Sequence, residues 1–131
     1  MRLKDRVAVV TGGGRGIGRA IALALAAEGA HLLVASDVLA EVQGVAREAA
    51  GLGGRAEALR ADVTRLSDME AMAARAVAAF GALDVLVTCA GVAGGGLVAE
   101  QPEADWTRVI DVNLNGTYRA IRAALPEMMR Q

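Results

Sequence analysis

The stretch TGGGRGIG, residues 11–18, constrains this chain more than any other, because it places five glycines in seven residues. It follows an apolar run, 6–11, that predicts a β-strand, and it leads into an alanine-rich run, 16–28, that predicts a helix. Backbone N–H groups at the start of a helix attract phosphate oxygens, and glycines remove the Cβ atoms that would keep a phosphate away. The stretch therefore predicts a phosphate-binding turn between a strand and a helix.

Three of these glycines have distinct expected roles. Gly12 permits the sharp turn out of the strand, Gly16 lets a pyrophosphate approach the main chain, and Gly18 lets the helix lie close to the sheet. Lys4 is the only lysine, so there is no Gly-Lys-Ser/Thr sequence, which excludes a Walker-type nucleotide site. A glycine cluster alone can be purely structural, but the frame of strand, turn and helix favours dinucleotide binding.

Short runs rich in Val, Leu and Ile alternate with longer Ala-rich runs along the whole chain. Parallel strands joined by crossover helices have this pattern, so we predict a doubly wound α/β fold. The expected strands are 6–11, 31–35, 55–60 and 84–88, and the expected helices are 16–28, 39–52, 67–79 and 102–129. We expect Ser67 to cap the third helix, and Gly116 and Pro126 are positions at which the last helix could bend or break.

Composition excludes several classes of function. A net charge of -1 gives no basic excess for nucleic acid. The longest uncharged apolar run, 20–27, is far short of the roughly 20 residues that span a bilayer, and the first residues start no signal peptide, so we expect a cytoplasmic chain without a membrane partner. Cys89 is the only cysteine and His31 the only histidine, so neither an internal disulfide nor an ordinary metal site is expected.

Four motifs occur in a fixed order along the chain. They are Thr11-Gly12-x-x-x-Gly16-Ile17-Gly18, Asp62-Val63 after the third expected strand, Cys89-Ala90-Gly91, and Val112-Asn113-Leu114-x-Gly116. Together they resemble the short-chain dehydrogenase/reductase family, which usually has Asn-Ala-Gly in place of the third motif. The resemblance spans 4–131, and its general character is that of bacterial 3-oxoacyl-carrier-protein reductases and related alcohol or sugar dehydrogenases. The motifs do not identify the substrate.

The resemblance implies a fold, an activity and a domain assignment. The fold would be a Rossmann-like parallel sheet with strand order 3-2-1-4, here incomplete because the family's later strands are absent from this sequence. Residues 1–131 would be the N-terminal part of a single dinucleotide-binding domain. The activity would be NAD(P)-dependent hydride transfer between the nicotinamide and a small carbonyl or alcohol substrate.

The family's binding residues carry over to matching positions of this chain. By resemblance, the pyrophosphate and ribose would contact Gly12, Gly16, Ile17 and Gly18, the adenine would contact Asp62 and Val63, and the nicotinamide-side ribose would contact Ala90 and Gly91. Asp62 has the alternative of capping a turn before Ser67, and Ile17 should be at least partly core. The hydroxyl of Thr11 should tie the end of its strand to its neighbours. Cys89 is expected to be a small buried filler, because no histidine or lysine stands ready to activate it.

The choice between NAD and NADP rests on the end of the second strand, where the family's NAD users have an acid that binds the ribose hydroxyls. Ser36 holds that position, and Asp37 follows where NADP-preferring members often have arginine. Arg15 could bind a 2'-phosphate or be a solvated loop charge, whereas Asp37 would repel one; unit charges about 4 Å apart interact by roughly 1 to 4 kcal/mol at effective dielectric constants of about 80 to 20. These residues favour NAD over NADP.

The family's chemistry uses a catalytic Asn, Ser, Tyr and Lys, of which this chain supplies only Asn113, which would hold a water linked to the Lys. Tyr118 and Arg122 imitate the family's Tyr-x-x-x-Lys pattern, but arginine does not replace a compact ammonium group, so we interpret Tyr118 as an ordinary helix tyrosine. We therefore expect an N-terminal piece of an oxidoreductase that is inactive alone. The alternative is a non-catalytic nucleotide-binding or assembly module.

Self-association is expected from two features. In the order 3-2-1-4 the strand 84–88 would be an unpaired apolar edge. The last helix carries Ile110, Leu114, Ile121 and Leu125 at helical spacing, and the family uses this helix in dimer contacts. We predict a homo-oligomer.

Overall fold

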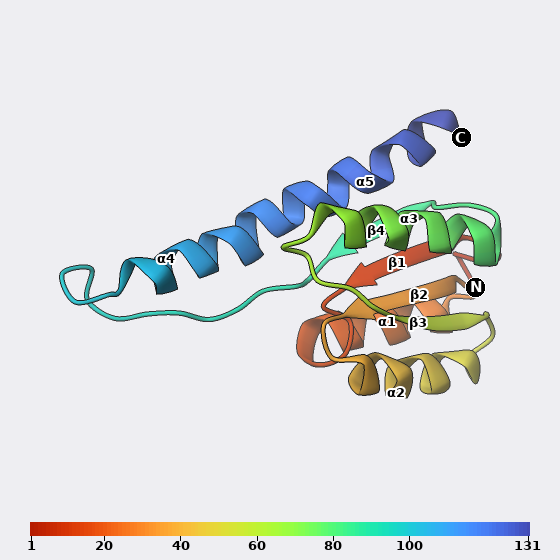
Figure 1. Cartoon of the computed structure of the whole chain (residues 1–131). Helices are drawn as coiled ribbons and strands as arrows, with labels where there is room; N and C mark the ends of the chain where they lie inside the picture. Colours follow the sequence, from red (N-terminus) through yellow and green to blue (C-terminus); the bar gives the residue numbers. More distant parts are fainter.

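A parallel sheet of four strands forms the centre of the computed structural model, which describes residues 1–131 (Figure 1). The strands are β1 (Val7–Thr11), β2 (His31–Ser36), β3 (Ala56–Arg60) and β4 (Val85–Thr88). Their order is β3-β2-β1-β4, with β1 paired to both β2 and β4. This topology confirms the predicted α/β fold and its strand order, and it places β4 at an edge.

Helices cover both faces of the sheet (Figure 1). On one face lie α1 (Gly16–Ala27) and α2 (Leu39–Ala50), and on the other lie α3 (Leu66–Phe80) and α5 (Gly116–Arg130). α4 (Glu103–Ile110) projects beyond the sheet and continues into α5 through η1 (Asp111–Asn115), a turn of π-helix. None of these helices combines the length and apolarity that crossing a membrane requires.

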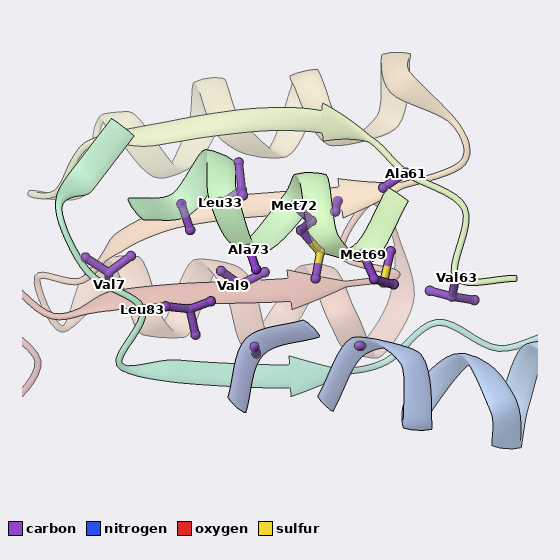
Figure 2. Close-up of a cluster of buried hydrophobic side chains, with 13 residues drawn as sticks. Val7, Val9, Leu33, Ala61, Val63, Met69, Met72, Ala73 and Leu83 are labelled. Carbon is purple, nitrogen blue, oxygen red and sulfur yellow. The ribbon is translucent and has the colours of Figure 1, made fainter. Parts of the chain in front are cut away.

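The core consists of two layers separated by the sheet. Val9 of β1 belongs to the layer that Met69 and Met72 of α3 complete (Figure 2). Its neighbours in the strand, Ala8 and Val10, belong to the opposite layer beneath α1 and α2. Because both faces of the sheet are buried, its central strands are continuous apolar runs and do not alternate with polar residues.

The start of α3 differs from the prediction, since Ser67 does not cap the helix. α3 begins at Leu66, and Arg65 occupies the N-cap position with no side-chain cap. A turn closed by the Arg65 N–H donating to the carbonyl of Asp62 (3.0 Å) brings the chain into the helix before Ser67. Ser67 therefore lies inside the first helical turn.

Gly116 and Pro126, the positions at which the last helix could bend or break, do not interrupt it. Its one irregularity is η1, which ends immediately before Gly116. Pro126 lies inside α5, exposed and within about one turn of the helix end. Proline has no backbone N–H, so one carbonyl in the preceding turn lacks its helical hydrogen bond, and at this exposed position water can bind it instead.

Two glycines allow a test of this packing. A Cβ on Gly44 in α2 would meet nothing within 4 Å, so Gly44→Ala should stabilise the chain by about 0.5–1 kcal/mol, the helix preference of alanine. A Cβ on Gly54 would lie 2.0 Å from the carbonyl oxygen of Ala30, so Gly54→Ala should cost about 1–3 kcal/mol. Urea denaturation measures both changes, and a Gly54→Ala variant as stable as the parent would contradict the packing of the turn before β3.

Candidate functional site

The carboxyl ends of the strands meet at one edge of the sheet, and a cavity of about 630 Å³ opens there between the turns that follow them. Open parallel sheets bind their ligands at this kind of edge. Every residue that the sequence predicts to bind a cofactor lines the cavity: Gly12, Arg15, Gly16, Ile17, Gly18, Ser36, Asp37, Asp62, Val63, Ala90 and Gly91. The structure thus brings these residues together, and their binding roles remain predictions.

The glycine turn lies between α1 and the end of β4, and its glycines are required by close packing. A Cβ on Gly18 would lie 2.1 Å from the carbonyl oxygen of Gly12. A Cβ on Gly12, whose φ is +62°, would lie 2.5 Å from the backbone nitrogen of Ala90. Gly16, with φ +55°, differs because a Cβ there would meet nothing within 4 Å. Gly12 and Gly18 allow the turn to pack against its neighbours, and Gly16 leaves open space at the cavity wall.

The backbone N–H groups of residues 14–18 donate to no acceptor in the protein. They include the first residues of α1, where aligned peptide dipoles give a helix its positive end. Unpaired amides beside the open space at Gly16 fit the phosphate oxygens of a dinucleotide. The residues present therefore suit the pyrophosphate of NAD or NADP.

Ile17 does not belong to the core, contrary to the prediction. Its side chain is 77% exposed. The helix positions that face the sheet are those of Gly18, Ala22 and Ala26, which recur every four residues and are buried. Ile17 lies on a different side of α1, where it lines the cavity.

Asp62 caps a turn before Ser67, which was the alternative to its predicted contact with the adenine. Its Oδ1 accepts hydrogen bonds from the Thr64 N–H (2.8 Å) and the Thr64 hydroxyl (2.7 Å). These bonds lower the pKa of the Asp62 carboxyl below its ordinary value. The Val63 N–H donates to no protein acceptor. The pair thus offers a carboxylate oxygen and an amide N–H to the amino group and a ring nitrogen of an adenine.

Asn113 lies in η1 and acts on the turn after β4. Its Oδ1 accepts from the Val92 N–H (2.8 Å), and its Nδ2 donates to the Val92 carbonyl (3.0 Å). Both polar groups of the amide are thereby engaged by one backbone position, next to Ala90 and Gly91. The structure shows Asn113 as a clamp on this turn, and its catalytic role remains a prediction.

A second clamp, which sequence reasoning missed, joins the last helix to the turn after β3. Arg119 of α5 donates to the Val63 carbonyl (3.2 Å) and forms an ion pair with Asp111 of η1 (2.7 Å). Gly116 allows the approach, because a Cβ there would lie 2.7 Å from Cγ2 of Val63. The bonds from Arg119 and Asn115 lower the pKa of the Asp111 carboxyl below its ordinary value. An Asp and an Arg eight residues apart on a helix gave no sequence signal for such a contact.

The remaining predictions about single side chains have mixed outcomes. The Thr11 hydroxyl accepts from the Ala90 N–H at 3.5 Å, which confirms that it ties β1 to its neighbour. Cys89 is only half-buried and lines the cavity, so it is not the buried filler expected. Tyr118 is 58% exposed and accepts from Arg122 (3.2 Å), as an ordinary helix tyrosine would. Several further residues line the cavity without having been predicted to bind a cofactor, among them Glu41, Thr64, Arg108 and Val112.

The Asp62 turn provides a pH test. Thr64→Val removes the hydroxyl donor, so the pKa of Asp62 should rise toward its ordinary value, as an NMR titration of its carboxyl would show. Because the folded-state pKa is depressed, the bond stabilises the fold above the unfolded-state pKa of about 4 and this stability is lost as pH falls through the folded-state pKa. Glu28, whose pKa is lowered to about 2 by hydrogen bonds from Arg2, is the internal control and should not change. An unaltered Asp62 pKa would show that the hydroxyl bond is not formed.

Comparison with known proteins agrees with this geometry. Residues 6–131 match the family described as short chain dehydrogenase. The chain is 40% identical over 125 residues to the 3-oxoacyl-[acyl-carrier-protein] reductase FabG of Staphylococcus aureus, covering 95% of this chain and 51% of that protein. It is 40% identical over 128 residues to the short-chain reductase protein NovJ of Streptomyces niveus, covering 98% and 49%.

A solved structure shows the same likeness in three dimensions. The 3-ketoacyl-ACP reductase from Sinorhizobium meliloti 1021 superimposes with a TM-score of 0.91 at 39% identity, over 95% of this chain and 49% of that one. The chain thus spans about half the length of the curated relatives it matches. With the motifs, the strand order and the glycine turn all in agreement, the chain belongs to the short-chain dehydrogenase/reductase family.

Proposed function

We propose that this chain is the cofactor-binding part of an NAD(P)-dependent oxidoreductase. The proposal rests on one observation at the start of α1. Backbone N–H groups without a protein acceptor lie there beside the open space at Gly16. Bound there, the dinucleotide supplies a nicotinamide that exchanges hydride with a carbonyl or alcohol carbon. The relatives' names support a carbonyl substrate, since two of them are reductases of 3-oxoacyl or 3-ketoacyl groups.

The chain's own residues bind and orient the cofactor at three places. The N–H groups of residues 14–18 hold the pyrophosphate, and the Asp62-Val63 pair orients the adenine. The Ala90-Gly91 turn, which Asn113 holds through Val92, lies against the nicotinamide-side ribose. We further propose that NAD is preferred, because Asp37 lines the cavity at the end of β2.

Cofactor binding is the direct test of this proposal. NADH should bind the 131-residue chain and change its fluorescence on titration, while ketone reduction should be undetectable because Asn113 is the only member of the family's catalytic set here. Gly16→Ala should weaken NADH binding by about tenfold or more, since its methyl group enters the cradle, and strain at φ +55° should cost about 1–2 kcal/mol of stability. Gly44→Ala is the matched control and should leave binding unchanged. Failure of NADH and NADPH to bind at millimolar concentration would remove the proposal.

We also propose that a second copy of the chain covers the outer face of the last helix. Large apolar side chains stand exposed along it: Trp106, Leu114, Tyr118, Ile121, Leu125 and Met129. Their spacing of three or four residues from Leu114 onward gives a continuous stripe on α5, and such a stripe is the usual surface of a symmetric helix pair.

Light scattering on a sizing column tests the association. The chain should elute as a dimer or larger, and Leu114→Glu with Leu125→Glu should convert it to a monomer, because a charge would be buried in the contact. Val98→Glu is the control, since Val98 is 85% exposed on the loop outside this helix. A monodisperse monomer of the parent chain would contradict the proposal.

A further inference from the structure

The carboxylate of Glu41 lies against the glycine turn. Glu41 belongs to the first turn of α2, and a Cβ built on Gly14 would lie 2.8 Å from its Cβ and 3.0 Å from its Oε2. The same point is 3.4 Å from the Ser36 hydroxyl. Glu41, Ser36 and Asp37 all line the cavity. A second acid, distant in sequence from the glycines, thus joins Asp37 where the turn after β1 meets the end of β2.

The charge of Glu41 is not compensated by its surroundings. Its side chain is half-buried, yet no ion pair or hydrogen bond engages its carboxylate. Arg15 also lines this part of the cavity but pairs with neither acid. The Ser36 hydroxyl is occupied, because it donates to the Val38 carbonyl and accepts from the Val38 N–H, both at 3.2 Å. The side-chain groups at this end therefore carry a net charge of one negative unit.

We propose that Glu41 is a specificity-determining residue that rejects the 2'-phosphate of NADP and so makes the site select NAD. This inference rests on the proposed function, which places the adenosine ribose at the end of β2. A ribose 2'-hydroxyl can donate a hydrogen bond to a carboxylate, whereas a phosphate, like a carboxylate, only accepts. The same side chain is thus compatible with NAD and opposes the added phosphate of NADP.

Burial should make the Glu41 carboxylate repel a 2'-phosphate more strongly than the Asp37 carboxylate does. Asp37 is exposed, so water and salt screen its charge. Glu41 is half-buried between α2 and the glycine turn, where screening is weaker and Coulomb repulsion is larger at the same distance. Most of the discrimination against the 2'-phosphate should therefore come from Glu41.

Calorimetric titration of the 131-residue chain with 5'-AMP and with adenosine 2',5'-bisphosphate isolates this end of the site. The parent should bind 5'-AMP more tightly. Glu41→Gln should strengthen binding of the bisphosphate about tenfold and change that of 5'-AMP less than about twofold, as loss of one repulsive charge would. The gain should shrink as salt is added. Asp37→Asn should give a smaller gain.

Glu70→Gln is the matched control, because Glu70 is exposed on α3, lies outside the cavity and loses the same charge. The inference is overturned if Glu41→Gln leaves the ratio of the two affinities unchanged, or if Glu70→Gln changes it equally. Binding of 5'-AMP to each variant shows that its site is folded. A folded parent chain that binds neither nucleotide would instead overturn the proposed function.

Discussion

The contact between the backbones of Gly12 and Gly18 is the constraint on which the site depends. Even a methyl group on Gly18 would lie 2.1 Å from the Gly12 carbonyl oxygen, so α1 can lie this close to the turn only without that side chain. The same closeness recurs between Gly12 and Ala90, which joins the turn to the end of β4. These contacts fix where α1 starts and therefore where its unpaired amides stand. The position of these unpaired amides is therefore a consequence of packing.

The last helix joins two parts of the cavity wall that are far apart in sequence. Its π turn carries Asn113, which holds Val92 after β4, and Asp111, which holds Arg119 against Val63 after β3. Hydrogen bonds from η1 and α5 thus hold both turns against the same helix. A displacement of this helix would move both turns, and with them both parts of the cavity wall, together. This links the exposed apolar stripe on α5, if a second copy covers it, to the geometry of the cofactor site.

The sequence predicted those features that local pattern determines. The strands and helices followed from hydrophobic runs and the glycine turn from its spacing, whereas the strand order and the predicted cavity residues followed from the family resemblance. Prediction from the sequence failed where a tertiary contact determines the position of a residue. Ser67 matched a capping pattern, but the Asp62 turn brought the chain into α3 earlier. Ile17 is apolar, but its position on α1 faces the cavity. Glu41 was missed because only the packing of α2 against the glycine turn brings its carboxylate there.

Charge is divided within one cavity, because free amides lie at the start of α1 and carboxylates lie at the end of β2. At the start of α1 the helix dipole and free amides favour an anion. At the end of β2 the half-buried Glu41 carboxylate lies beside a Ser36 hydroxyl that is already bonded. Glu41 also lies against Gly14, so the carboxylate and the free amides meet within one turn of the chain. In the proposed mode of binding, the amides of the glycine turn supply affinity for the dinucleotide, and Glu41 sets the preference between NAD and NADP.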